Sequence, residues 1–148
     1  MAGKPDTEAE TILHATCVAV AGKAAVFTGV SGSGKSALAL NLMALGAGLV
    51  ADDRVILTKV GRVVSASAPE TISGMIEARG IGLLKARACG PAPVECVVDL
   101  DQVETARMPP VRQTMLLGQS VTLLFKVNSL HFPAALMQYL KEGRWPEQ

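Results

Sequence analysis

The sequence has little excess of charge of either sign. Lysine and arginine number 14 and aspartate and glutamate 13, which gives a formal net charge of +1 at pH 7 over 148 residues. Proteins that attract nucleic acid or anionic membranes carry a clear basic excess. The near-neutral balance therefore argues against both partners, and any anion must be bound by a local site.

Cysteine is scarce and is not spaced for a metal site. Cys17, Cys89 and Cys96 form no C-x-x-C pair, and the chain has two histidines. This pattern argues against zinc and against a disulfide framework. An odd number of cysteines in apolar surroundings predicts reduced, packed thiols, as in the cytosol.

Long apolar runs are also missing. The longest, residues 37–51, includes Asn41 and is shorter than the roughly 20 residues of a membrane-spanning helix. The first ten residues are polar and acidic, unlike a signal peptide. Hydrophobic residues still make up 49% of the chain, enough for a packed core. We expect a soluble cytoplasmic protein with a flexible arm at residues 1–10 and one domain at residues 11–148.

One motif is complete. Residues 29–36 match G-x-x-x-x-G-K-[ST] at every fixed position and lie between a β-like run at 24–28 and a helix-like run at 37–45. Glycines let backbone N–H groups surround phosphates, and the following helix adds the positive end of its dipole. The alternative is a turn that binds nothing. The motif predicts that nucleotide phosphates are held by Gly29, Val30, Ser31, Gly32, Ser33, Gly34, Lys35 and Ser36, with Lys35 on the β- and γ-phosphates and Ser36 on Mg²⁺.

The rest of the pattern predicts an α/β fold with a mixed sheet and the phosphate loop between a strand and a helix. We expect helices at residues 35–45 and 131–141, and strands at residues 11–20, 24–28, 48–53, 54–60, 62–66, 94–100, 111–117 and 120–125. The final helix could pack within the protomer or contribute to an interface. The acids Asp99, Asp101 and Glu104 are expected in a solvated loop.

An acidic pair, Asp52 and Asp53, follows the strand expected at residues 48–53. In a phosphoryl-transfer site one carboxylate could support Mg²⁺ while the other accepts a proton from an attacking hydroxyl. A solvated turn is the alternative, because Asp-Asp before a charged residue is also a common turn composition.

These motifs together resemble a known family. In chain order, His14, the loop at 29–36, residues 49–55, the Glu-Ala-Arg-Gly-Ile-Gly run at 77–82 and residues 110–112 resemble the catalytic domain of HPr kinase/phosphorylase. The run at 77–82 is the more specific part, because many unrelated enzymes share the loop. The resemblance implies a short form without the N-terminal domain, a PEP-carboxykinase-like P-loop kinase core and a hexamer.

The resemblance also implies a reaction. ATP with Mg²⁺ would phosphorylate a serine on HPr, the phosphocarrier of the bacterial sugar phosphotransferase system, and inorganic phosphate would remove that group as pyrophosphate. Asp52 would take the seryl proton, while Asp53 and Glu77 would join Ser36 at the metal. Arg79 and Arg112 would neutralise the transferring group, and His14 would lie near the phosphate site.

Other interpretations stay open. His14 could be a structural histidine, Glu77 and Arg79 a cross-strand ion pair, and Arg112 an ordinary surface residue. The chain could also be a small-molecule P-loop kinase, although it has no Arg-rich lid insertion. A nucleotide-sensing module without turnover is favoured by Ala37, where longer family members carry an acidic residue.

Overall fold

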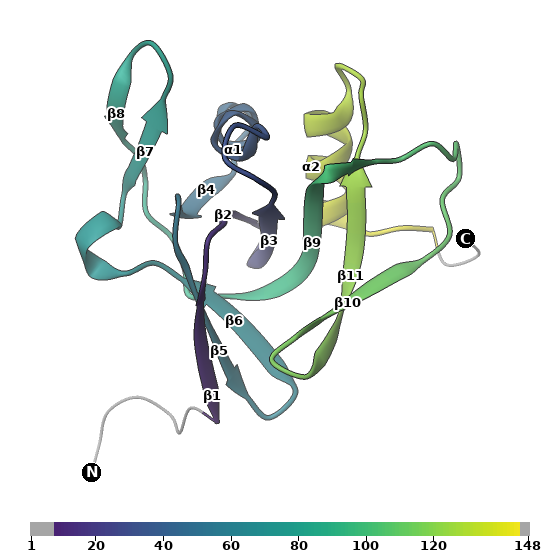
Figure 1. Cartoon of the computed structure of the whole chain (residues 1–148), viewed down its shortest axis with the longest axis horizontal. Coiled ribbons are helices and arrows are strands. Elements are labelled where there is room, and N and C mark those ends of the chain that lie inside the picture. The colour runs from purple at the N-terminus through teal and green to yellow at the C-terminus, as the bar shows by residue number, and fades with distance from the viewer. Residues whose placement is uncertain (1–7, 146–148) are drawn as a thin grey trace.

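Nine strands form one hydrogen-bonded sheet in the computed structural model, which describes residues 8–145. They are β1 (Ala9–Leu13), β2 (Thr16–Val20), β3 (Lys23–Thr28), β4 (Gly48–Ala51), β5 (Val55–Val60), β6 (Val63–Ser67), β9 (Ala92–Val103), β10 (Arg112–Leu116) and β11 (Gln119–Lys126). Their order is β1-β5-β6-β9-β3-β2-β4, with β11 paired to β9 and β10 paired to β11 (Figure 1). Because β9 pairs in parallel with β3 and β11 while the other pairs are antiparallel, the expected mixed sheet is confirmed.

Strand β9 joins two parts of this sheet. Its first residues, Ala92 and Pro93, pair antiparallel with β6, and the residues from Val94 onward pair in parallel with β3. β9 ends at Val103, three residues beyond the strand expected from sequence. Asp99 and Asp101 therefore lie at the carboxyl end of a strand beside β3, so the prediction of a solvated loop was wrong for these two residues.

Two helices and a small hairpin complete the described part of the chain. They are α1 (Lys35–Ala44), α2 (Phe132–Glu142), and a separate two-stranded sheet of β7 (Met75–Ala78) and β8 (Gly82–Lys85), which a 3₁₀ turn at Glu70–Ile72 precedes. Figure 1 shows α1 between the β7–β8 hairpin on one side and α2 on the other. α1 therefore packs against an element on each of these two sides.

Buried side chains alternate between the two faces of the central strands. Val18 and Phe27 pack in a cluster with both helices, whereas their neighbours Cys17 and Val26 pack in a second cluster with β5 and β6. This period of two is what a sheet covered on both faces requires. In α2, the apolar residues Phe132, Leu136, Met137 and Leu140 are buried in the first cluster, which confirms packing within the protomer.

The structure corrects the expectations at the N-terminus. The single strand expected at residues 11–20 was wrong, because the chain breaks at His14 and Ala15. β1 pairs with β5, whereas β2 pairs with β3 and β4. A change of partner leaves no trace in an alternating pattern, since both strands keep the same period. Of the arm predicted at residues 1–10, Ala9 and Glu10 belong to β1, and residues 1–7 lie outside the described residues.

The remaining expectations concern the helix end, the thiols and the membrane. α1 ends at Ala44, so Leu45 is exposed at the helix end instead of continuing the apolar face of Leu38.

The three thiols are free, as predicted, and burial raises the pKa of Cys96 to about 12, which keeps it protonated. Within residues 8–145, no helix has the length and apolar character needed to cross a membrane.

Candidate active site

The motif at residues 29–36 forms the turn between β3 and α1. Gly34 adopts a φ of 103° as the residue that starts the helix, a left-handed conformation that favours glycine. Gly29 has a φ of 148°, and a Cβ there would lie 2.5 Å from Ser33 Oγ. That hydroxyl is buried and has no hydrogen-bond partner among the described residues. The loop therefore has the backbone conformation that its glycines predict, and the Ser33 hydroxyl is a buried donor without a partner among the described residues.

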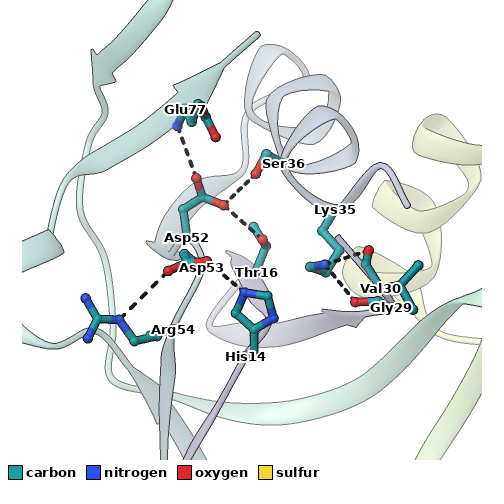
Figure 2. A network of polar contacts seen from close by, with 10 residues as sticks. All are labelled: His14, Thr16, Gly29, Val30, Lys35, Ser36, Asp52, Asp53, Arg54 and Glu77. Carbon is teal, nitrogen blue, oxygen red and sulfur yellow. Dashed lines mark hydrogen bonds and ion pairs between the residues drawn. The ribbon is translucent and has the colours of Figure 1, made fainter. Parts of the chain in front are cut away.

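Lys35 lies on the inner side of this loop. Its side chain is largely buried, and Nζ donates hydrogen bonds to the carbonyl oxygens of Gly29 at 2.7 Å and Val30 at 3.1 Å (Figure 2). The flexible stem of lysine lets an ammonium group exchange such carbonyl contacts for phosphate oxygens. Lys35 is thus held at the position where the motif requires a cation.

Asp52 is the centre of a buried polar network. Its Oδ1 accepts hydrogen bonds from Ser36 Oγ at 2.7 Å and Thr16 Oγ1 at 2.9 Å, and its Oδ2 accepts one from the Glu77 backbone N–H at 3.1 Å. Figure 2 shows the carboxylate between these three donors. Asp52 is 8% exposed. The network joins β2, α1, β7 and the end of β4, so the proximity of Asp52 to the phosphate loop is confirmed.

Asp53 has different surroundings. Its side chain is 64% exposed, its Oδ1 lies 2.8 Å from His14 Nε2, and its Oδ2 lies 3.9 Å from Arg54 Nε. Figure 2 shows His14 and Arg54 on either side of it. Asp53 has a φ of 76°, a left-handed conformation that Asp tolerates better than most residues and that is often found at functional sites. The break between β1 and β2 is what frees His14 from a strand to reach this carboxylate.

Glu77 and Arg79 lie across from the loop. Both line a cavity of about 300 Å³ together with Lys35 and Ser36. The structure records no ion pair between Glu77 and Arg79, the alternative that the sequence left open. A carboxylate, a guanidinium, an ammonium and a hydroxyl around one cavity can bind a magnesium phosphate, because they offer charges of both signs.

Arg112 is not among the residues that line this cavity. It forms an ion pair with Glu104, and its guanidinium lies 4.4 Å from the centre of the Phe125 ring. Glu104 directly follows β9, and Phe125 belongs to β11. The structure therefore brings together Lys35, Ser36, Asp52, Glu77 and Arg79, joins His14 to Asp53, and leaves Arg112 in a separate contact.

The ion pair of Arg112 predicts a change in acid stability. Burial tends to raise the pKa of Glu104, but the Ala106 N–H and the Arg112 guanidinium outweigh it and hold the pKa below its ordinary 4.5. Ionised Glu104 therefore stabilises the fold above about pH 4.5, and this contribution is lost as the pH falls through the lowered pKa. We expect Glu104→Gln to flatten the fall of the urea unfolding midpoint below about pH 4.5. Glu10→Gln, at an exposed position on β1, serves as the control; equal slopes for Glu104→Gln and wild type would contradict the prediction.

Two polar residues of the site were missed from sequence. Thr16 donates to Asp52, and Asp101 accepts hydrogen bonds from the Val30 N–H at 3.1 and 3.2 Å, which ties the start of the loop to β9. The signal for Asp101 was its position after a buried apolar run, because ligands bind at the carboxyl ends of parallel strands. Thr16 gave no such signal, since threonine is common in strands.

Comparisons with known proteins show similarity to one family. The family model described as HPr Serine kinase C-terminal domain matches residues 6–103. HPr kinase/phosphorylase from Alkaliphilus metalliredigens is 41% identical over 101 residues, which cover 66% of this chain and 33% of that protein. HPr kinase/phosphorylase from Verminephrobacter eiseniae is 42% identical over 79 residues, which cover 53% of this chain and 25% of that protein. The matched segment thus spans a third or less of these relatives.

A solved structure shares the fold. The HPr(Ser) kinase/phosphatase from Coxiella burnetii superposes with a TM-score of 0.74 at 21% sequence identity, over 88% of this chain and 94% of that chain. The family model includes the loop, Asp52, Asp53, Glu77 and Arg79, and it ends before Arg112. On the strength of that match over most of its length, the chain belongs to the family of HPr serine kinase C-terminal domains.

Proposed function

We propose that this chain transfers the γ-phosphoryl group of ATP to a serine hydroxyl of HPr, and that inorganic phosphate removes the group in the reverse direction. Two kinds of evidence support the proposal: membership of the HPr serine kinase C-terminal domain family and relatives named HPr kinase/phosphorylase. The observation that carries it is the network in which Asp52 joins Ser36 to Glu77 directly beside Lys35. Asp52 thereby lies against the phosphate loop, as a P-loop kinase core of the PEP-carboxykinase-like type would require.

The residues at this site fit Mg²⁺. Asp52 accepts a hydrogen bond from the Ser36 hydroxyl, which leaves the lone pairs of Ser36 Oγ available to a metal. Glu77 lines the same cavity as Ser36. Mg²⁺ in kinase sites usually takes one or two protein ligands and completes its shell with phosphate oxygens and water. Bound there, the ion would neutralise charge on the β- and γ-phosphates. Ser36 and Glu77 would hold it, with Asp52 orienting Ser36.

The contacts favour a division of roles between the two aspartates opposite to the one expected from the resemblance. Three of the roughly four acceptor positions of Asp52 are filled by protein donors, so it is poorly placed to accept a proton from a substrate. Asp53 is exposed and contacts His14 through one oxygen. We assign Asp53 as the proton acceptor and His14 as the residue that orients it.

The proposed transfer exchanges one phosphorus–oxygen bond for another. The seryl oxygen forms a bond to the γ-phosphorus, the bond from that phosphorus to the ADP oxygen breaks, and the seryl proton passes to Asp53. In reverse, an oxygen of hydrogen phosphate forms a bond to the phosphoserine phosphorus, and the bond from that phosphorus to the seryl oxygen breaks. The phosphate proton passes through Asp53 to the seryl oxygen, and the pyrophosphate so formed is released. Lys35 and Arg79 would stabilise the charge on the transferring group in both directions. Arg112 would have to leave Glu104 to take part.

One experiment tests partner, reaction and reversibility together. The protein is incubated with HPr, ATP and Mg²⁺, and phosphoserine is measured by mass spectrometry before and after addition of inorganic phosphate. We expect phosphoserine to form and then to decrease with release of pyrophosphate. ATP binding without phosphoserine would support a nucleotide sensor instead, and transfer to metabolites but not to HPr would support a small-molecule kinase. The hexamer implied by the family resemblance and the cytoplasmic location expected from the composition stay predictions, and sedimentation equilibrium would test the first.

A further inference from the structure

A bulge in β9 places an acidic side chain against the phosphate loop. Asp99 pairs with Phe125 of β11, but the next residue of β11 pairs with Val103, so residues 100–102 of β9 lie outside the regular pairing. The pairing of β9 with β3 also ends at Asp99. Bulges of this kind redirect a side chain and are common beside functional sites. Asp101, in the middle of the bulge, therefore lies beyond the end of β3, where the loop begins.

Asp99 holds the bulge in this conformation. Its Oδ1 accepts a hydrogen bond from the Asp101 backbone N–H at 2.9 Å, and its Oδ2 accepts one from Gln102 Nε2 at 3.0 Å. Both oxygens of Asp99 are therefore used within β9. The oxygens of Asp101 instead accept hydrogen bonds from the Val30 N–H, at 3.1 and 3.2 Å. One aspartate thus shapes the strand, and the other contacts the loop.

Asp101 and Lys35 contact the same peptide group of the loop from its two ends. The peptide between Gly29 and Val30 donates its N–H to Asp101. Its carbonyl oxygen accepts a hydrogen bond from Lys35 Nζ at 2.7 Å (Figure 2). Because a peptide group is planar, its N–H and C=O turn together, and rotation of this peptide would break both contacts. The Asp101 contact therefore helps to fix the carbonyl that Lys35 faces.

Glycine makes this peptide dependent on its contacts. A Cβ at Gly29 would lie 2.5 Å from Ser33 Oγ and 3.3 Å from Asp101 Oδ1, so a larger residue would force a shift. The same lack of a side chain gives the peptide many conformations when nothing holds it. A ligand that must order such a segment binds more weakly, since part of its binding free energy is spent on the ordering. A peptide that is already fixed avoids this loss.

We propose that Asp101 is a positioning residue of the phosphate site, which holds the Gly29–Val30 peptide in place before the donor binds and thereby raises the affinity for the donor. The inference rests on the proposed function, because it takes the loop to bind the donor's phosphates. Asp101 acts through the backbone of the loop. Its charge has the opposite effect, since it repels phosphate, but Asp101 is exposed and solvent ions screen it.

Three replacements separate the hydrogen bond from the charge. Asp101→Asn removes the charge and keeps an acceptor oxygen, whereas Asp101→Ala and Asp101→Val remove both. Valine suits a strand, so this variant provides a second test if alanine disturbs folding. Glu95→Ala is the matched control, because Glu95 is an exposed carboxylate near the start of β9, at the end away from the loop.

Four measurements are made on each protein. Isothermal titration calorimetry gives the affinity for MgATP, and transfer to HPr gives kcat and the KM for ATP. Amide hydrogen exchange, followed by nuclear magnetic resonance without nucleotide, reports on the Val30 N–H directly. Thermal unfolding verifies that each variant is folded.

We expect Asp101→Ala and Asp101→Val to bind MgATP about tenfold more weakly, which corresponds to the cost of ordering one backbone residue. The KM for ATP should rise by a similar factor, while kcat changes by less than about threefold, because bound phosphates then hold the loop themselves. The Val30 amide should exchange faster in both variants. Asp101→Asn should restore most of the affinity and the slow exchange, and Glu95→Ala should match the wild type.

Equal behaviour of Asp101→Asn and Asp101→Ala would overturn the proposal, because the acceptor oxygen would then be irrelevant. Unchanged MgATP affinity, or unchanged exchange of the Val30 amide, in the alanine and valine variants would also overturn it and leave the proposed function standing. If the wild type did not bind MgATP, the proposed function itself would fail. The exchange of the Val30 amide would still decide whether Asp101 holds the peptide.

Discussion

Asp53→Asn should lower the rate of phosphoryl transfer to HPr by about 10²- to 10⁴-fold, the usual contribution of a general base. The amide cannot take the seryl proton, yet its oxygen can still accept a hydrogen bond from His14. Asparagine also tolerates the left-handed backbone that Asp53 adopts, so the fold should be kept. Single-turnover transfer from ATP measures the rate, and calorimetry should show an affinity for MgATP close to that of the wild type.

The control for this variant is Arg54→Gln. Arg54 lies 3.9 Å from the other oxygen of Asp53 and is exposed, so its replacement removes a neighbouring charge without removing the proton acceptor. We expect the transfer rate to change by less than about tenfold. A normal rate in Asp53→Asn, together with a large loss in Asp52→Asn at saturating Mg²⁺, would return the role of base to Asp52.

Asp52→Asn should act on metal binding and on stability together. The carboxylate accepts three hydrogen bonds, and an amide has an oxygen on one side only. Its NH₂ group would face either the Glu77 N–H, which cannot accept, or the two hydroxyls, which would have to reorient. An unsatisfied buried polar group costs about 1–3 kcal/mol of the free energy of unfolding. Ser36 would also lose the acceptor that orients its hydroxyl. Losses of this kind weaken metal affinity by about 10- to 100-fold, which a Mg²⁺ titration of ATP binding would measure.

A double variant separates the two effects. Thr16→Val removes one of the three hydrogen bonds to the carboxylate, so Asp52→Asn combined with Thr16→Val should lose less stability than the sum of the two single variants. The Mg²⁺ affinity should stay low, because Ser36 still lacks its carboxylate partner. If Asp52→Asn alone bound Mg²⁺ normally and unfolded at the wild-type urea concentration, the orienting role of Asp52 would be wrong.

The phosphate loop and the two helices could be predicted from sequence because their signals are local. Glycine spacing fixed the turn at residues 29–36, and apolar spacing indicated a helix on its C-terminal side. The β5–β6 hairpin also followed from a local turn at Gly61. Each of these elements is determined by residues that lie within a few positions of one another.

The contacts that assemble the site are long-range and could not be predicted in the same way. His14 and Asp53 are separated by 39 positions, and Val30 and Asp101 by 71. Nothing in the sequence around Arg112 indicates that Glu104 and Phe125 surround it, since both contacts depend on how β10 and β11 fold back beside β9. The family resemblance supplied the candidates, and the pairing of strands decided which of them meet.

The placement of β11 and α2 has a consequence for shortened versions of the chain. The family match ends at residue 103, but β11, one of the two parallel partners of β9, and the apolar face of α2 both come later in the sequence. A fragment cut at that boundary would expose to water the apolar cluster that contains Phe27 and Leu42, and it would leave one edge of β9 unpaired. Such fragments tend to self-associate through unpaired strand edges and exposed hydrophobic patches. The smallest soluble unit therefore has to reach at least Leu140.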